Sequence, residues 1–222
     1  MENIEAEYGA VRKVTKNAVS LTGKVYVPKE ERHVRFESSL ERDFVIRNSF
    51  DPNVDAIKEQ PIKIDFEDDY GVSDYTPDFL IFYNNHGGPE FKPHLFEVKY
   101  RADIKKRWPE FKRKWKAALE YCDKMNWEFK VVTEVEIRTD YLFNAKFLKR
   151  YNNSKFINRE DFINVLSCIQ EEKETTPQEV INKFESRSNS LLYTLWYLVA
   201  NYYVGTDLNR KLTMESRIWS MD

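Results

Sequence analysis

At 222 residues, the chain is long enough for one large domain, or for one ordinary domain joined to a small one. Its composition, 41% hydrophobic and 15% aromatic, excludes a disordered chain, and no apolar run reaches the ~20 residues that span a bilayer. The net charge of −2 argues against a generic nucleic-acid binder, and the acidic start does not resemble a secretory signal. Cys122 and Cys168 lack metal-site spacing, which favours a reducing, cytoplasmic location over a disulfide or zinc framework.

The pattern of apolar residues and turn formers predicts an α/β domain over residues 1–151. Residues 1–37 hold scattered basic residues and one strand-like piece, 24–27, so we expect an N-terminal basic arm or an irregular cap. Beyond them we expect, in chain order, a helix from 38 or 39 to about 48, a strand at 62–66, a turn over 67–74, a strand at 79–83, a loop over 84–89, a strand at 94–100, a long helix over 103–125, a strand at 129–133 and a helix over 141–151. Such an order is typical of a mixed central sheet flanked by helices.

Residues 152–222 change character and predict a second, smaller domain that is mainly helical. Helices are expected over 159–168, 177–186 and 190–203, followed by a strand-prone tail over 211–220. Three helices and a small β element are the pattern of a winged helix, and a helical domain without a wing fits the same residues. We expect this domain to contact DNA or a partner protein.

Charge is distributed unevenly along the first domain. Residues 51–78 are strongly acidic, whereas residues 92–116 are strongly basic. A protein that grips phosphates and holds cations has such a distribution, although solvated helix faces explain the charges alone more simply. The candidate DNA-binding residues are Arg101, Lys105, Lys106, Lys112 and Lys116.

A short constellation of acidic and basic residues carries the predicted chemistry. Glu97 and Lys99 are two residues apart on a predicted strand, so their side chains share a face while Val98 faces the core. If the strand opened by Asp78 is the neighbour of this strand, the Asp78 carboxylate stands opposite Glu97. Two such anions share a proton or hold a cation. Glu41, in the first turn of the preceding helix, adds a further carboxylate.

Oxygen ligands without a Cys or His cluster favour Mg²⁺, with Mn²⁺ as a substitute. The predicted metal ligands are Glu41, Asp78, Glu97 and the carbonyl of Val98. Lys99 completes the catalytic set with Glu41, Asp78 and Glu97, because its ammonium group can orient water and stabilise charge on a phosphate. The bare P-D…E-x-K pattern also arises by chance, but its order on two predicted strands before a basic helix favours phosphodiester hydrolysis.

Several ordered runs resemble the TnsA-type endonuclease subunit of heteromeric transposases, a member of the PD-(D/E)xK restriction-endonuclease-like superfamily. They are Gly23-Lys24-Val25-Tyr26, Arg35-Phe36-Glu37-Ser38, Leu40-Glu41-Arg42-Asp43-Phe44, Glu59-Gln60-Pro61, Tyr75-Thr76-Pro77-Asp78-Phe79, Glu97-Val98-Lys99 and Val131-Val132-Thr133-Glu134. The resemblance covers roughly residues 12–151 and implies a restriction-endonuclease-like fold.

The resemblance also implies a role. Such subunits cut the 5′ strand at each transposon end, and a DDE-type transposase subunit (TnsB-like) cuts and joins the 3′ strand. An AAA+ ATPase regulator (TnsC-like) is the other expected partner, and double-stranded DNA at transposon ends is the substrate in a prokaryotic, nucleoid-associated setting. Glu41, Asp78 and Lys99 fall on the family's catalytic positions, whereas Glu97 falls where some members carry Gln.

Two other functions compete with this one. A free-standing restriction or repair nuclease would use the same residues but would cut DNA without a partner. A nuclease-like scaffold that joins DNA to other proteins would have no need of the clustered carboxylates.

Overall fold

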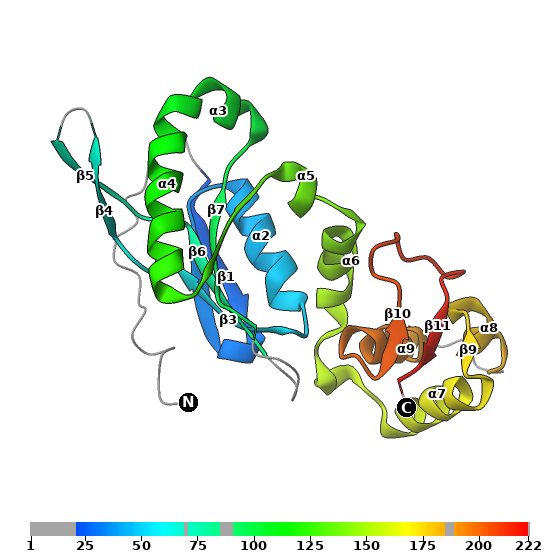
Figure 1. Ribbon diagram of the computed structural model, residues 1–222. Helices are drawn as coiled ribbons and strands as arrows, with labels where there is room; N and C mark the ends of the chain where they lie inside the picture. The colour runs from blue at the N-terminus through cyan, green and yellow to red at the C-terminus, as the bar shows by residue number, and fades with distance from the viewer. Residues whose placement is uncertain (1–20, 69–70, 85–90, 185–188, 222) are drawn as a thin grey trace. The chain divides into compact units, whose positions relative to one another are not determined.

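The computed structural model describes residues 21–68, 71–84, 91–184 and 189–221, which form two compact units (Figure 1). The first unit ends at Arg138 and the second begins at Thr139. This division falls earlier in the chain than the expected boundary at 151/152. No helix in the described ranges combines the length and the apolar character needed to cross a membrane.

The first unit is built on a four-stranded mixed sheet in the order β3-β6-β7-β8. Its strands are β3 (Val54–Glu59), β6 (Phe79–Tyr83), β7 (His94–Val98) and β8 (Glu128–Val132). The β3–β6 and β6–β7 pairs are antiparallel, whereas β7 and β8 are parallel. The parallel pair needs a crossover connection, which the helices between β7 and β8 supply. The predicted mixed central sheet is therefore confirmed.

A helix covers each face of this sheet, α2 (Ser39–Phe50) on one side and α4 (Trp108–Met125) on the other (Figure 1). Cross-strand pairing decides which residues meet which helix, because successive side chains alternate between the faces. Phe79 pairs with Phe96, and Phe44 of α2 packs on both rings at centroid distances of 5.1 and 5.0 Å. Leu80 pairs with Leu95 on the other face, where they join Phe111, Trp115, Ala118 and Cys122 of α4 in a buried cluster.

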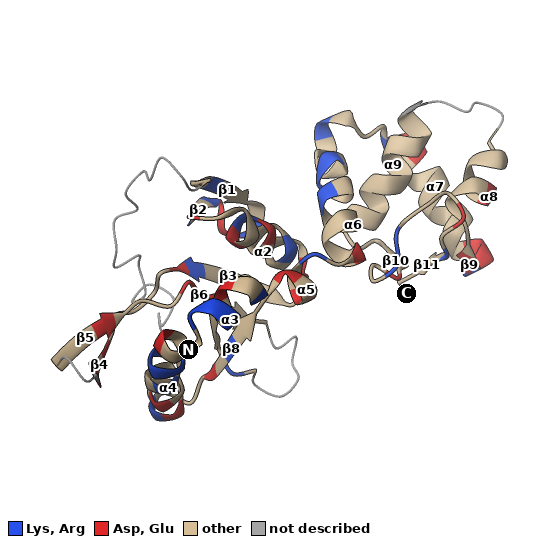
Figure 2. Ribbon diagram, turned by 90° about the horizontal axis from the view of Figure 1, so that it is seen from above, with Lys and Arg blue, Asp and Glu red and all other residues tan. Residues whose placement is uncertain are grey.

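The expected irregular arm is in part a hairpin of β1 (Gly23–Val27) and β2 (Arg32–Phe36), which packs beside α2 and β3 (Figure 2). The basic residues predicted within 1–20 lie outside the described residues. Arg32 anchors the hairpin to β3, because its guanidinium binds Glu59 at 2.9 Å, Glu30 at 2.9 Å and the Ile57 carbonyl. One strand of the pair was predicted, but the return strand was missed.

Two further corrections concern strands. The strand predicted at 62–66 is β4 (Ile64–Asp68), which pairs with β5 (Gly71–Tyr75) in a separate hairpin and not with the central sheet. The turn expected over 67–74 was therefore wrong over most of its length, because β5 occupies it. The edge position in the central sheet belongs to β3, which follows a turn at Pro52 and Asn53. Most of the loop expected over 84–89 lies outside the described residues.

The single long helix predicted over 103–125 was also wrong. The structure has α3 (Arg101–Lys106) and α4, which are separated at Arg107. Pro109 is the second residue of α4 and has no N–H to donate to the carbonyl four residues earlier. A continuous helix would also place the proline ring against that carbonyl, so the chain restarts the helix instead.

The second unit contains α6 (Asp140–Leu148), α7 (Arg159–Glu172), β9 (Glu174–Thr175), α8 (Pro177–Asn182), α9 (Asn189–Ala200), β10 (Val204–Thr206) and β11 (Ile218–Ser220). The three strands form an antiparallel sheet in the order β10-β11-β9. The helix–strand–helix–helix–strand–strand order is that of a winged helix, so the winged alternative is the one present. Asn144 of α6 binds the Leu208 and Arg210 carbonyls and the Leu212 N–H, which explains why α6 belongs to this unit.

Candidate active site

The neighbouring strands β6 and β7 bring together the predicted Asp78, Glu97 and Lys99. Asp78 immediately precedes β6, and its N–H donates to the Phe96 carbonyl at 3.1 Å. Its carboxylate oxygen Oδ2 accepts the Val98 N–H at 2.7 Å. Because β6 and β7 run antiparallel, the start of one strand lies at the end of the other. The side chain of Asp78 is therefore held at the end of β7 where Glu97 and Lys99 project.

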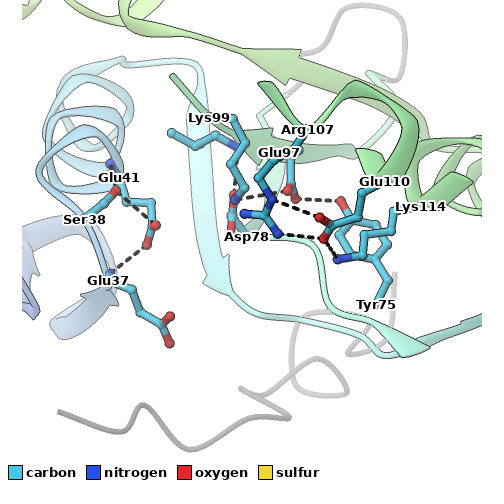
Figure 3. Close-up of polar contacts among 11 residues, drawn as sticks. Glu37, Ser38, Glu41, Tyr75, Asp78, Glu97, Lys99, Arg107, Glu110 and Lys114 are labelled. Atoms are coloured by element: carbon cyan, nitrogen blue, oxygen red, sulfur yellow. Dashed lines mark hydrogen bonds and ion pairs between the residues drawn. The ribbon is translucent and has the colours of Figure 1, made fainter. Parts of the chain in front are cut away.

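The Lys99 ammonium group lies between the two carboxylates (Figure 3). Its Nζ is 3.0 Å from Asp78 Oδ2 and 3.0 Å from Glu97 Oε1. Burial alone would lower the pKa of Lys99, but the charges of Asp78 and Glu97 outweigh burial and raise that pKa well above its ordinary value. Lys99 is thus a fixed positive charge that joins two acidic groups.

Glu41 lies on the first turn of α2 and serves there as part of the helix cap. Its Oε2 accepts the Glu37 N–H at 2.7 Å, and its Oε1 accepts the Ser38 hydroxyl at 3.1 Å. Of the two positions at which this helix was expected to start, Ser38 is the N-cap, because its hydroxyl accepts the Glu41 N–H. Glu41 is close enough to Asp78 and Lys99 for their charges to affect its pKa, but among the described residues it makes no hydrogen bond to either.

The sequence interpretation assigned no role to Tyr75, which the structure places beside Glu97. The Tyr75 hydroxyl donates to Glu97 Oε2 at 2.6 Å, and both side chains are buried. Tyr75 stands three residues before Asp78 at the end of β5, so the β4–β5 hairpin delivers it to the site. Its place next to Thr76-Pro77-Asp78 was the one feature of the sequence that could have indicated this contact. A buried tyrosine hydroxyl needs a polar partner, and the site carboxylates are such partners.

Burial and the nearby Asp78 charge keep Glu41 and Glu97 protonated to unusually high pH. Burial raises the pKa of Glu97 to about 7, and the Asp78 charge adds to this effect, which Lys99 and the Tyr75 hydrogen bond oppose. Burial likewise raises the pKa of Glu41 to about 7, again with a contribution from Asp78. A bound cation would relieve this repulsion, so the cluster is suited electrostatically to a metal.

The donor set fits a hard divalent cation in its chemistry. Carboxylate oxygens come from α2, from β7 and from the residue before β6, and Asp78 Oδ1 has no hydrogen-bond partner among the described residues. Within a strand, the N–H and C=O of one residue point to the same side, so the Val98 carbonyl faces Asp78 as its N–H does. The described side chains contain no cluster of three acidic, His or Cys groups already converging on one point, since Lys99 lies between two carboxylates and Glu41 caps its helix.

Two family models match the chain in tandem. One is described as TnsA-like endonuclease N terminal and matches residues 51–134, and the other, TnsA endonuclease C terminal, matches residues 136–208. The chain belongs to the TnsA endonuclease family. It is therefore a TnsA-type nuclease of the Tn7 class with a restriction-endonuclease-like fold. No curated protein matches the chain.

In this TnsA-type chain, Asp78, Glu97 and Lys99 lie inside the matched N-terminal segment, whereas Glu41 precedes it. A second network, also missed from the sequence, holds Glu41's helix to the end of β7. Arg138 binds the buried Asp43 carboxylate at 2.9 Å and donates to the Tyr100 hydroxyl at 3.1 Å. The hydroxyls of Ser39 and Tyr100 are 2.9 Å apart. These contacts connect the residues beside Glu41 with the residue after Lys99.

The predicted DNA-binding residues lie on α3 and α4 and are all exposed. They are Arg101, Lys105, Lys106, Lys112 and Lys116. Lys116 is 3.7 Å from Glu120, an exposed pair that contributes little. Their exposure leaves them available to phosphates, and their contact with DNA stays a prediction.

Proposed function

We propose that this chain is a Mg²⁺-dependent endodeoxyribonuclease that hydrolyses the 5′ strand at transposon ends. The observation that supports this proposal most strongly is the Asp78–Lys99–Glu97 cluster, in which one ammonium group joins two carboxylates at 3.0 Å each. A surface ion pair has no need of a second, buried carboxylate, and taking the Glu97 carboxylate out of water together with the partly buried Asp78 and Lys99 is costly. Phosphodiester hydrolysis requires such a combination of acidic and cationic groups.

In the proposed site Asp78, Glu97 and the Val98 carbonyl hold Mg²⁺ or Mn²⁺, and Glu41 adds a ligand. The metal, when bound, lowers the pKa of water and stabilises the charge on the phosphate oxygens. Lys99 donates to the attacking water or to a phosphate oxygen, because its ammonium group carries a proton and a positive charge at physiological pH. Tyr75 keeps the Glu97 carboxylate in place.

We further propose that the chain works as the TnsA-like subunit of a heteromeric cut-and-paste transposase. Its partners are then a DDE-type transposase subunit that cuts the 3′ strand, an AAA+ ATPase regulator and the duplex DNA of the transposon ends. Family membership supports this assignment.

Calorimetric titration of Mn²⁺ into the native chain and into Asp78→Ala tests the metal site. Asp74→Ala is the matched control, because Asp74 is an exposed acidic residue whose carboxylate pairs with Lys63. We expect binding that Asp78→Ala loses and Asp74→Ala keeps, and equal binding by all three proteins would refute the assignment. Cleavage of an end-labelled 5′ strand, with and without the partner subunits, separates a transposase subunit from a free-standing nuclease. Unchanged transposition with Asp78→Ala would favour a scaffold.

A further inference from the structure

The β1–β2 hairpin presents two chemically different faces. Its inner face buries Val25, Val27, Val34 and Phe36. Its outer face exposes the alternate residues Lys24, Tyr26, His33 and Arg35. In the register of the pair, Lys24 is opposite Arg35 and Tyr26 is opposite His33, with 5.3 Å between the two ring centroids. The outer face is therefore a compact patch of two cations and two aromatic hydrogen-bonding groups.

Directly opposed like charges destabilise a hairpin. Neither Lys24 nor Arg35 has an ion pair among the described residues, so no acidic side chain there offsets their repulsion. The other basic residues of the hairpin, by contrast, have partners within the protein. Arg32 is paired with Glu30 and Glu59, and the Lys29 ammonium group donates to the carbonyls of Asp51 and Val54. Among the described residues, Glu30 and Glu59 are thus engaged by Arg32, and the outer Lys24–Arg35 pair is available to an external anion.

This patch lies next to the candidate active site in the chain. Strand β2 ends at Phe36, and the following residue, Glu37, donates its N–H to Glu41. The Lys24–Arg35 pair is adjacent to the final Gly23–Phe36 pair, so it stands at the end of the hairpin that leads into α2. Helices α3 and α4, which follow Lys99 in the chain, also carry several Lys and Arg residues (Figure 2). Each strand of a DNA duplex carries a phosphate every ~3.4 Å along its axis, so phosphates flank any scissile bond.

We propose that the outer face of the β1–β2 hairpin binds the phosphate backbone of the duplex that enters the active site, an inference that rests on the proposed nuclease function. Lys24 and Arg35 neutralise phosphates, and the Tyr26 hydroxyl and His33 imidazole donate hydrogen bonds to phosphate or sugar oxygens. Such contacts are independent of base sequence. They set the position of the duplex on the protein.

The helix of the second unit that corresponds to a DNA-recognition helix does not supply such backbone contacts. In DNA-reading helix-turn-helix folds, the recognition helix enters the major groove. The corresponding helix here, α9, runs NSLLYTLWYLVA and contains no Lys or Arg. Its Thr194, Leu195, Trp196 and Leu198 are buried, so little of it is available to a groove. Any cations that meet the DNA backbone must therefore come from elements other than α9.

The test is the salt dependence of duplex binding by the full chain. Fluorescence anisotropy with a labelled, non-specific duplex in EDTA is recorded from about 50 to 200 mM salt. The native chain is compared with Lys24→Gln/Arg35→Gln. The matched control, Lys124→Gln/Lys155→Gln, removes the same charge from two exposed lysines outside the hairpin.

We expect the hairpin variant to bind more weakly, with a log Kd against log salt slope smaller by about 1.8, since each lost phosphate contact contributes about 0.9. The control variant should keep the native slope. Without DNA, the melting temperature of the hairpin variant should equal or exceed the native value, because the like-charge pair is gone, and this measurement shows that the variant is folded.

Equal slopes for the native chain and the hairpin variant would overturn the hairpin proposal and leave the nuclease proposal intact. An equal loss in both variants would also overturn it, because net charge alone would then explain the effect. The Mn²⁺ titration of Asp78→Ala tests the nuclease site without DNA. Failure of the nuclease proposal is thereby distinguished from failure of the hairpin proposal.

Discussion

Replacing Tyr75 with Phe removes one hydroxyl from the most buried part of the candidate site. The lost contact is the 2.6 Å hydrogen bond to Glu97 Oε2. Phe retains the ring, so packing on the neighbouring core residues is preserved and no cavity opens. Any change in stability then reports the hydrogen bond and the protonation state of Glu97.

The expected loss depends on pH. Glu97 has an ordinary carboxyl pKa of 4.5 in the unfolded chain, and burial raises its pKa to about 7 in the folded chain. Above that value, Glu97 is ionised and the phenol donates to a charged acceptor, a bond worth about 1.5–3 kcal/mol. Below it, the carboxyl is neutral and the bond is worth about 0.5–1.5 kcal/mol.

The direction of this pH dependence follows from the linkage between proton binding and folding. The Tyr75 hydrogen bond lowers the pKa of Glu97, so its removal raises that pKa further. A carboxyl whose folded pKa lies above its unfolded pKa binds more protons in the folded state, and its stability contribution falls as pH rises. The destabilisation caused by Tyr75→Phe must therefore grow as pH rises through about 7.

Urea unfolding of the full chain at about pH 6 and about pH 8 measures this difference. Tyr26→Phe is the matched control, because Tyr26 is 45% exposed, and its hydroxyl has no hydrogen bond within the described part of the chain. That control should change stability by less than about 0.5 kcal/mol. Mn²⁺ affinity should also fall about 10–100-fold in Tyr75→Phe, as is usual when the partner of a metal ligand is removed. A pH-independent loss, or none, would refute the argument.

Two further predictions concern the surroundings of this cluster. Arg138→Gln should lower the free energy of unfolding by about 1–3 kcal/mol, because the buried Asp43 carboxylate loses its 2.9 Å partner, and a thermal melt against Arg150→Gln as the control measures this. Mn²⁺ affinity should rise with pH up to about 8, since protons on Glu41 and Glu97, whose pKa values are raised to about 7, must leave before the metal binds. Calorimetry in buffers of different ionisation enthalpy counts those protons, and pH-independent binding without proton release would contradict the prediction.

Local patterns were sufficient to predict the elements that carry the site. The continuous apolar run of β6 and the mainly apolar β7 each require only side-chain character, and a serine at position 38 or 39 favours a helix start by its chemistry alone. Strand alternation then placed Glu97 and Lys99 on one face without any knowledge of the fold. The pairing of β6 with β7 remained an assumption at that stage, and the register of Phe79 with Phe96 confirms it.

Elements that depend on distant partners were not predictable in the same way. Strand β3 has buried Ala56, Ile57 and Glu59, and a shift in register after Val54 breaks its alternation. Its buried Glu59 is acceptable only because Arg32 reaches it from β2. Strand β5 has one buried residue among the positions whose exposure is described, so its hairpin has almost no hydrophobic pattern. In each case a long-range contact decides the structure.

The same distinction explains the site residues that were missed. Tyr75 binds Glu97 and Arg138 binds Asp43, and these partners are 22 and 95 residues away in the chain. Their side chains are common types without a motif of their own, so their partners become evident only from the fold. Glu41 was predicted from its place in a helix, but its carboxylate is engaged in capping α2. A residue that both caps a helix and supplies a ligand is held by its cap bonds, whereas Asp78 retains a carboxylate oxygen without any partner among the described residues. Asp78 is for this reason the stronger position at which to test the metal, and Glu41 the weaker one.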